Sequence, residues 1–480
     1  MSLIGDILSR CVASRGHRRD EISQGRRRRS GNGGRRHMVG PTAATASAQR
    51  RGAPLKILAL TNLFPSPSRP GNGVFLKHRL QHLSRLPGVE MRLIAPVPWF
   101  PSTARIFGQY AKLAQTPRDD DTSGIPARFI RYPMLPKISM WITPLSIALS
   151  ALKAIRDMKR SGFEPDVIDA YYLYPDGVAA CLLGVWLRKP VMLTALGTDA
   201  TQIARQPIPG ALICWAARRA IAVTAVCHAL IDQLIGCGIA PEKLTVVQHG
   251  VDLELFSPPH DRDALRQTFG LKRFTMISVG HLSQNKGQHL AIRALTEIPD
   301  VDLLIVGDGP ERDRLRALAS DLGATDRVRF IGSVDQPHLA LLMGAADLLV
   351  SCSEYEGISN VLLEALACGT PVAATPVWGS PEIVADPKIG LLFKERSGGA
   401  IADGIRSVMR HSWDRSYIRH YSLRYDWAAT AEQHRCVMLQ GLGAAKALPD
   451  RPSAMADGSP MADDCQALVT SSAYIAGSVR

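Results

Sequence analysis

From Leu55 onward the sequence alternates short, strongly apolar runs with amphipathic or polar stretches of helical length. Buried parallel strands read as near-continuous apolar runs, and a crossover of helical length must separate each strand from the next. The apolar runs of the first half are 56–62, 91–97, 167–171, 191–197, 222–226 and 245–249, with helices expected at 74–85, 142–159, 177–187 and 229–236. This alternation predicts the α/β class, with helices on both faces of a parallel sheet.

The same alternation starts a second time after a break in the pattern. The second series of apolar runs is 275–280, 303–307, 329–332, 348–351 and 371–375. The segment before it opens with Ser257-Pro258-Pro259, residues that interrupt regular structure and suit a hinge. A chain of 480 residues is long enough for two buried cores, so we expect two doubly wound, Rossmann-like domains facing a cleft.

The pattern also sets the expected boundaries. We place the first domain at residues 55–255, the linker at 256–273 and the second domain at 274–420. Residues 421–444 contain Trp427 at the head of an expected helix that crosses back to the first domain. Residues 445–480 return to Pro, Ala, Asp and Ser without periodicity, which predicts a disordered tail.

The net charge of +14 is concentrated near the N-terminus. Residues 1–54 hold 12 Arg against three acidic residues, a net charge of +9, and show no sustained apolar periodicity. This composition predicts a disordered basic leader, which is either a solvated tail, a segment that binds nucleic acid or anionic lipid, or the product of a start assigned upstream of Met38. Only about a third of the charge is left for the folded body, so no nucleic-acid partner is expected there.

The lengths of the apolar stretches and the spacing of the cysteines indicate in which part of the cell the protein is expected. The longest apolar stretches, such as 179–187, fall short of the roughly 18 to 20 residues that span a bilayer. Nine cysteines are scattered and never spaced as C-x-x-C, which argues against a zinc site or a disulfide frame. We expect a cytoplasmic protein. Mixed apolar and basic stretches at 106–113 and 137–159 also suit peripheral contact with an anionic membrane, or ordinary core-facing helices.

The most informative local segment is SEYEGISNVLLEALACGTPV, from Ser353 to Val372. It predicts a loop, a helix and the start of a strand, with Asn360 as the N-cap and Gly369 followed by Pro371 as the stop. Backbone N–H groups that open such a helix form an anion pocket, which the helix dipole reinforces. A diphosphate fits this pocket, and the residues expected to hold it are Gly357, Ile358, Ser359, Asn360, Val361 and Leu362.

Two carboxylates flank the expected anion pocket. Glu356 lies in the loop before the helix, and Glu364 lies about one turn inside it. A bound diphosphate would leave a sugar on one side and a ribose on the other, and both present hydroxyl groups that donate to carboxylates. We assign Glu356 to the sugar and Glu364 to the ribose diol, against the alternative of a turn residue and a solvated helix residue.

Loops after three strands of the second series complete the expected site, because loops at the carboxyl ends of parallel strands line the ligand crevice. Lys286 follows the strand at 275–280, where its ammonium group can neutralise diphosphate oxygens and assist departure of the leaving group. The turns after the next two strands suit a flat base, and the residues expected there are Gly307, Gly309, Gly332 and Ser333.

These stretches together resemble the retaining glycosyltransferases of family 4, which have the two-domain GT-B architecture. Glu356 and Glu364 match the Glu-x7-Glu motif of that family. Other matching stretches within residues 245–393 are Gln248-His249-Gly250-Val251-Asp252 with Phe256, Lys286-Gly287, Gly307-Asp308-Gly309-Pro310, and Pro381-Glu382-Ile383-Val384 with Gly390. The first half is similar, more loosely, to bacterial cell-surface polysaccharide and teichuronic-acid-type transferases through Asn62-Leu63-Phe64-Pro65, Gly73-Val74-Phe75, Tyr174-Pro175-Asp176-Gly177 and Gly197-Thr198-Asp199.

The resemblance implies a nucleotide-sugar donor held by the second domain, with no separate cofactor, and a glycan or lipid-linked acceptor held by the first. It also implies retention of configuration at the anomeric carbon without a required metal, and no Asp-x-Asp triplet follows a strand of the second half. The residues to which it assigns catalysis are Glu356, Lys286 and His281. The candidates for acceptor or sugar contact in the first domain are Gly73, Tyr171, Tyr174 and Asp199.

Three features depart from the family pattern. His281 stands where Arg is usual, and because a neutral imidazole stabilises a diphosphate less than a guanidinium, activity is expected to fall as the pH rises through its titration range. Tyr171 or Leu196 stands where the first domain often carries His. Trp378-Gly379 replaces a frequent double glycine.

These departures leave two alternatives open: a nucleotide-sugar epimerase of the same fold, and a non-catalytic partner that binds nucleotide sugars. A pyridine-nucleotide dehydrogenase is disfavoured, because Gly71 and Gly73 arrive too long after the first strand to form a Gly-x-Gly-x-x-Gly turn.

Overall fold

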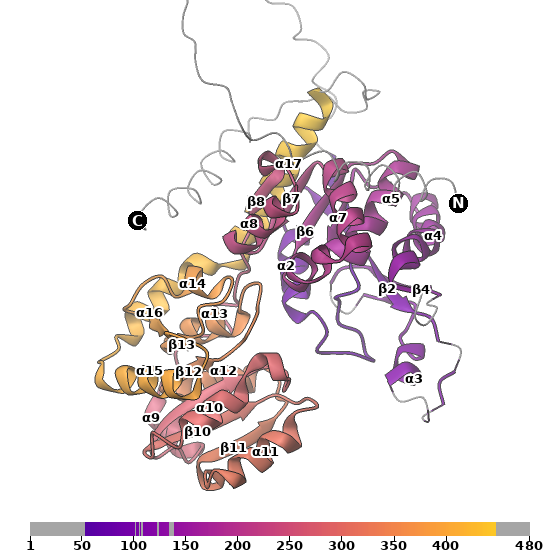
Figure 1. Cartoon of the computed structure of the whole chain (residues 1–480). Helices are drawn as coiled ribbons and strands as arrows, with labels where there is room; N and C mark the ends of the chain where they lie inside the picture. Colours follow the sequence, from indigo (N-terminus) through magenta and orange to yellow (C-terminus); the bar gives the residue numbers. More distant parts are fainter. Residues whose placement is uncertain are drawn as a thin grey trace, which may run out of the picture.

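The computed structural model describes residues 53–100, 102–104, 106, 109–121, 124–133 and 139–447. The expected leader up to residue 52 and the expected tail from residue 448 lie outside these residues. The described chain forms two α/β domains, coloured indigo to magenta and salmon to orange in Figure 1. The predicted α/β class and the paired Rossmann-like architecture are confirmed.

The first domain is built on an eight-stranded sheet in the order β3-β4-β2-β1-β5-β6-β7-β8, parallel except for β3. Its strands are β1 (Leu55–Leu60), β2 (Val89–Pro98), β3 (Asp119–Asp120), β4 (Ala127–Tyr132), β5 (Val167–Tyr171), β6 (Val191–Ala195), β7 (Ala222–Ala225) and β8 (Leu244–Val246). Its helices are α2 (Val74–Ser84), α3 (Gln109–Ala114), α4 (Ser139–Arg160), α5 (Val178–Leu187), α6 (Thr198–Thr201), α7 (Pro207–Arg219) and α8 (His228–Gly236).

The second domain has a six-stranded, wholly parallel sheet in the order β11-β10-β9-β12-β13-β14. Its strands are β9 (Phe274–Val279), β10 (Val301–Val306), β11 (Val328–Gly332), β12 (Leu348–Ser351), β13 (Val372–Ala374) and β14 (Gly390–Leu392). The helices that follow β8 are α9 (Arg262–Thr268), α10 (Gln288–Ala294), α11 (Arg312–Asp321), α12 (Gln336–Ala345), α13 (Asn360–Ala367), α14 (Ser380–Ile383), α15 (Gly398–Arg410), α16 (Arg415–Ser422) and α17 (Trp427–Ala447).

Every apolar run singled out in the sequence is a strand, with ends shifted by at most three residues. The elements that the sequence did not predict include the strands β3, β4 and β14 and the helix α7. Arg128 and Arg131 interrupt the apolar character of β4, which lies near the edge of its sheet. The α7 helix opens with Pro207, Pro209 and Gly210, which read as a loop because Pro and Gly usually end helices, although Pro is tolerated in the first turn.

Both sheets reverse their strand order beside their first strand, with β1 between β2 and β5 and β9 between β10 and β12. In doubly wound folds the crevice at this reversal, outside the carboxyl ends of the strands, is where ligands bind. The topology therefore defines the region of each domain in which a functional site is expected.

The chain passes between the domains near Val251 and again near Tyr425, and these two segments pack against each other. The amide of Val251 donates to the carbonyl of Tyr425 at 2.7 Å, and Val251 forms a parallel bridge with Asp426. A Cβ atom added at Gly250 would lie 2.7 Å from the backbone of Trp427, so only glycine fits there. From Trp427, α17 runs back to the first domain and packs beside α2 (Figure 1).

A buried polar cluster ties α17 to the first domain. His434 of α17 contacts the Asp169 carboxylate through Nε2 at 2.8 Å and the Arg79 guanidinium through Nδ1 at 3.1 Å. The Tyr171 hydroxyl donates to the same carboxylate at 2.6 Å, and all four side chains are fully buried. The expectation that Tyr171 contacts the acceptor is therefore wrong, because strand alternation directs its ring toward α17.

The packing of the two crossing segments can be tested by mutation. Gly250→Ala should lower the thermal unfolding midpoint, because overpacking at this contact costs about 1–3 kcal/mol and no rearrangement of a flexible side chain can relieve it. The matched variant is Gly443→Ala in α17, where an added Cβ meets nothing within 4 Å. It should leave the midpoint unchanged or raise it, because alanine favours helix. Equal midpoints for the two variants would contradict the packing described.

Candidate active site

One cavity of about 610 Å³ lies between the two domains. Its walls are the ends of β2 and β4, the loops after β1, β5, β6, β8, β9 and β12, and the starts of α2 and α13. The lining residues are Asn62, Leu63, Arg69, Asn72, Phe75, Pro96, Pro98, Tyr132, Tyr172, Leu196, Gly197, Thr198, His249, Asn285, Lys286, Tyr355, Glu356, Gly357, Ile358 and Asn360. Its position at both carboxyl edges makes it the candidate active site.

Lys286 and Glu356 meet in this cavity as an ion pair. Lys286 ends the short turn after β9, Glu356 lies in the loop before α13, and Nζ lies 2.7 Å from Oε1. The two side chains are only 27% and 16% exposed, so water screens the pair less than a surface pair. The structure thus places an ammonium group and a carboxylate together beside the start of α13.

The expected anion pocket is at the start of α13, but Asn360 is not the N-cap. Ser359 occupies that position with extended backbone, and Asn360 is the first helical residue. Neither side chain caps the helix, and the buried Ser359 hydroxyl has no hydrogen-bond partner among the described residues. Because the first amides of an α-helix have no intrahelical partner, those of Asn360 and Val361 remain available to an anion. The amide of Leu362 already donates to the Ser359 carbonyl at 3.2 Å.

Asn360 does not cap the helix because its side chain has another partner. Its Oδ1 lies 2.8 Å from Nδ1 of His249, which follows β8. The His249 ring stacks on Phe75 of α2, with centroids 4.8 Å apart. Burial, together with the charge of Arg79, lowers the pKa of His249 to about 3, so its imidazole is neutral and suited to this hydrogen bond. This contact links the start of α13 to the first domain.

Glycines allow the backbones of the two domains to touch at the cavity. A Cβ atom at Gly357 would lie 2.1 Å from the carbonyl oxygen of Leu196, and one at Gly379 would lie 2.4 Å from the oxygen of Gly357. At Gly197, φ is 154° and a Cβ atom would lie 3.2 Å from the Gly357 amide. Trp378, which replaces the first residue of the frequent double glycine, adopts φ 48°. The loop before α13 is therefore fixed against the loop after β6.

Glu364 lies on α13 but does not line the cavity. Burial raises the pKa of its carboxyl group to about 7. The unfolded chain has the ordinary, lower pKa, so the folded protein binds this proton more tightly and stability falls as the pH rises from about 4.5 toward 7. The carboxylate form, which accepts hydrogen bonds from hydroxyl groups, becomes dominant only above about pH 7.

The turns expected to hold a base lie together at the carboxyl ends of β9, β10 and β11. Gly307 donates its amide to the Gly332 carbonyl at 2.8 Å, and a Cβ atom at Gly307 would lie 2.0 Å from the oxygen of Gly280. A Cβ atom at Gly309 would lie 2.3 Å from the oxygen of Leu282. Ser333 directly follows Gly332. None of the four expected residues lines the cavity, and their contact with a base stays a prediction.

The other expected residues surround the cavity without lining it. His281 is exposed in the loop after β9, and Tyr174 is buried in the core. Gly73 has φ 70° and begins α2, where a Cβ atom would lie 2.2 Å from the oxygen of Leu63. Asp199 is fully buried and accepts hydrogen bonds from the amides of Leu173, Leu196 and Gly197 at 2.8–3.1 Å. It positions the loops after β5 and β6 rather than facing an acceptor.

The first-domain wall contains polar residues that were not predicted from the sequence as site residues. They are Asn62, Arg69, Asn72, Tyr132 and Tyr172. Tyr172, with φ 84°, turns into the cavity at the point where Tyr171 turns into the core. Alternation along β5 was the available signal, since two adjacent tyrosines at a strand end must face opposite sides. The other four depend on long loops and on β4, which carried no clear pattern.

Glu382 of α14 binds the first domain directly. Its carboxylate accepts from the amides of His228 and Ala229, at 2.7 and 3.3 Å, and contacts the His228 ring at 3.0 Å. Carboxylates are favourable at helix N-termini, and here the capped helix, α8, belongs to the other domain. The hydrogen bond to Glu382 raises the pKa of His228. The Pro381-Glu382 stretch therefore joins the domains beside the cavity.

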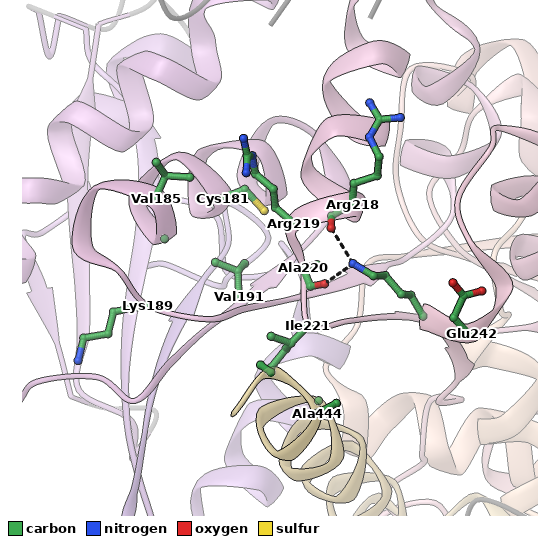
Figure 2. A pocket seen from close by; sticks show the side chains of 14 residues that line it. Cys181, Val185, Lys189, Val191, Arg218, Arg219, Ala220, Ile221, Glu242 and Ala444 are labelled. Carbon is green, nitrogen blue, oxygen red and sulfur yellow. Dashed lines mark hydrogen bonds between the residues drawn. The ribbon is translucent and has the colours of Figure 1, made fainter. Parts of the chain in front are cut away.

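A second cavity of about 470 Å³ lies at the amino ends of β6 and β7, away from the ion pair, and is shown in Figure 2. Its walls include Val185, Arg219, Ile221 and Ala444 of α17. Lys243 donates to the carbonyls of Arg218 and Ala220 at 2.6 and 3.0 Å. Basic residues are expected beside such helix ends to satisfy carbonyl groups.

Two features are absent from the described residues. No group of three or more His, Cys, Asp or Glu side chains is placed to hold a metal ion there. Among the same residues, no helix combines the length and apolar character needed to cross a membrane.

Solved structures of other proteins share this arrangement of two α/β domains. Anabaena HepE in complex with UDP superposes with a TM-score of 0.62 at 23% identity, covering 81% of this chain and all of that one. Sucrose-phosphate synthase from Thermosynechococcus elongatus superposes with a TM-score of 0.64 at 21% identity and the same coverage. Two Rossmann-like domains with a cavity between their carboxyl edges define the GT-B class.

Sequence comparisons identify the family. Residues 75–255 match the family described as Glycosyltransferase Family 4, and residues 261–425 match the one described as Glycosyl transferases group 1. The chain belongs to the family 4 glycosyltransferases, as its sequence predicted.

Two curated relatives illustrate the match. D-inositol 3-phosphate glycosyltransferase from Mycobacteroides abscessus is 36% identical over 237 residues, which are 46% of this chain. The chain spans about half of that relative, 52%. The putative teichuronic acid biosynthesis glycosyltransferase TuaC from Bacillus subtilis is 29% identical over 359 residues, covering 73% of this chain and 88% of the relative.

The raised pKa of Glu364 gives a second test. If this carboxylate accepts ribose hydroxyls, affinity for UDP-glucose should increase as the pH rises from 5.5 to 8, because deprotonation near pH 7 creates the acceptor. Isothermal titration calorimetry should show this increase in the parent protein. Glu364→Gln should bind more weakly at pH 8 and show a flat profile. The same pH dependence in both proteins would remove Glu364 from the donor site.

Proposed function

We propose that this protein is a glycosyltransferase that moves a sugar from a nucleoside-diphosphate sugar to a glycan or lipid-linked acceptor. The proposed reaction retains the configuration of the anomeric carbon and requires no metal ion. The observation that carries the proposal is the Lys286–Glu356 pair, 2.7 Å apart, beside the uncapped start of α13 in a cavity between two domains. Family membership supports the same reaction class.

The donor diphosphate is proposed to bind the amides of Asn360 and Val361 together with the Lys286 ammonium. Negative charge grows on the leaving phosphate as the bond from the anomeric carbon to its oxygen breaks. Preorganised amides and an ammonium group stabilise that charge more than they stabilise the bound donor. Glu356 then accepts hydrogen bonds from hydroxyl groups of the transferred sugar.

The acceptor is proposed to approach from the first-domain wall. Its hydroxyl oxygen bonds to the anomeric carbon on the face that the diphosphate leaves, and the hydroxyl proton passes to the departing phosphate oxygen. This same-face exchange retains the configuration and needs no protein nucleophile. UDP is the first donor nucleotide to test, since HepE has been solved with UDP and with UDP-glucose.

Lys286→Ala should lower kcat by about 10² to 10³, because it removes one charge-stabilising donor. Glu356→Ala should also abolish most turnover. Lys394→Ala is the matched control, since Lys394 is exposed in the second domain and does not line the cavity. A thermal-shift series with UDP-, GDP- and ADP-sugars selects the donor, because a ligand of the folded state raises its apparent stability.

The same assays distinguish the alternatives. Donor turnover without any acceptor would favour the epimerase, and an inactive parent protein that still binds donor would favour the non-catalytic partner. Proton NMR of the first product should show the anomeric configuration of the donor, and an inverted product would contradict the proposed mechanism.

Contact with a membrane surface is proposed for the first domain, where a lipid-linked acceptor would arrive. Large apolar side chains are exposed there at Trp99 (54%), Ile106 (87%), Trp141 (56%) and Leu149 (55%). Lys159 and Arg160 end α4, the helix that carries Trp141 and Leu149. Aromatic and basic residues together favour the interface of an anionic bilayer.

Sedimentation with vesicles tests this contact. The parent protein should pellet with phosphatidylcholine vesicles that contain 30% phosphatidylglycerol, and the double variant Trp99→Ala with Trp141→Ala should pellet several-fold less. The control is Leu341→Ala, which removes an apolar side chain that is 47% exposed on α12 of the second domain. Equal pelleting of all three proteins would remove the proposed membrane contact.

A further inference from the structure

Apart from tyrosines, the described first-domain wall of the interdomain cavity carries two ionisable groups, Arg69 and His249, and the His249 imidazole is neutral because burial lowers its pKa to about 3. The second-domain wall carries Lys286 and Glu356, which pair with each other at 2.7 Å. The described walls therefore have a net positive charge, and its source lies on the side assigned to the acceptor.

Hydrogen bonds fix the backbone of Arg69, whereas its side chain has no hydrogen-bond or ion-pair partner among the described residues. Arg69 and Ser66 exchange two backbone hydrogen bonds of 2.9 and 3.2 Å, and the amide of Asn72 donates to the Arg69 carbonyl at 3.2 Å. The Asn72 side chain donates to the carbonyl of Asn62 at 3.0 Å, which closes the loop after β1. Among the described residues, the Arg69 guanidinium forms no hydrogen bond or ion pair, and the residue is exposed.

Acidic groups behind the wall do not balance this charge. Asp176 is fully buried, accepts from the amide of Asn62 at 2.7 Å, and has a pKa that burial raises to about 8. Its carboxyl group is therefore largely neutral at pH 7. The fully buried Asp199 carboxylate is occupied by the amides of Leu173, Leu196 and Gly197. Arg69 thus faces the cavity without a compensating carboxylate in the described structure.

Two phenols stand on the same wall as hydrogen-bond donors. Tyr132 ends β4 and Tyr172 follows β5, and both line the cavity. Burial, and next the nearby Asp176, raise the pKa of Tyr132 to about 12, while the charge of Arg69 acts in the opposite direction. Burial also raises the pKa of Tyr172. Both hydroxyls keep their protons at neutral pH, and a guanidinium beside phenol donors suits an oxyanion.

We propose that the acceptor of this enzyme carries an anionic group, a carboxylate or a phosphate, which Arg69 binds on the first-domain wall with the Tyr132 hydroxyl beside it. The proposal rests on the proposed function, because it assigns this wall to the acceptor. It predicts that neutral sugars are poor acceptors. The preference for anionic acceptors is expected to come from the charge of Arg69 and not from the length of its side chain alone.

The test compares three sugars that differ in charge: D-glucuronate, D-glucose 6-phosphate and D-glucose. Each is titrated by NMR into the full-length protein, with and without saturating UDP. The parent protein should bind at least one anionic sugar about tenfold or more tightly than glucose. The preferred anion distinguishes a carboxylate-bearing from a phosphate-bearing acceptor.

Arg69→Gln should reduce binding of the preferred anionic sugar about tenfold, leave glucose unchanged and keep UDP affinity within twofold. Arg69→Lys should recover part of the loss. The matched control is Arg85→Gln, which makes the same charge change on an exposed residue at the far end of α2, roughly 15 Å along that helix. This control should behave as the parent protein.

Three outcomes would overturn the proposal: no preference for anionic sugars, an equal preference in Arg69→Gln, or a loss of UDP affinity in Arg69→Gln that matches the loss of anion binding. The last outcome would assign Arg69 to the donor diphosphate. Absence of binding of UDP, GDP and ADP alike to the parent protein would instead contradict the proposed function, and the titrations without nucleotide would still decide whether Arg69 selects anions.

Discussion

The site depends on how closely the two domains approach at the loop before α13. Gly357 touches the carbonyl of Leu196 so closely that a Cβ atom there would lie 2.1 Å away, and Gly379 packs behind Gly357 with the same lack of space. This contact fixes the loop that carries Glu356 and leads into the first turn of α13. A side chain at Gly357 would separate the walls of the cavity and displace that turn.

Other contacts hold the same arrangement at its edges. Asn360 forms a hydrogen bond with His249, and the Glu382 carboxylate caps α8. His434 of α17 forms a hydrogen bond with Asp169 of the first domain. Each contact joins chain segments far apart in sequence, and each uses a polar group that sits in buried or half-buried surroundings. Since an unpaired polar group in such surroundings is costly, these bonds favour one relative placement of the domains. The cavity is thus shaped as much by polar contacts between domains as by the two sheets.

The sequence predicted the parts that follow from local periodicity. Apolar runs located eleven strands, and the Ser353–Val372 segment located the loop and α13, whose Leu362, Leu363 and Leu366 are buried in the core. The sequence placed Lys286 and Glu356 at one site because both follow strands of the same expected parallel sheet. The sequence could not predict the long-range partners. The hydrogen bond between Asn360 and His249 depends on how the segment after β8 lies against α13, and local capping preference alone predicts Asn360 as the N-cap.

The residues of the first-domain wall could not be predicted from local sequence either. Tyr171 and Tyr172 are adjacent in sequence, and only the turn at the end of β5 decides which one faces the cavity. Arg69 lies in a loop without periodicity, so its contribution to the cavity depends on the hydrogen bonds that close that loop.

The central claim is that one diphosphate is bound jointly by the start of α13 and by Lys286. A crystal structure of the protein with UDP-glucose tests it most directly. The account predicts phosphate oxygens within about 3 Å of the Lys286 ammonium and of the amides of Asn360 and Val361, with the glucose beside Glu356. A diphosphate bound elsewhere, such as in the cavity of Figure 2, would contradict it.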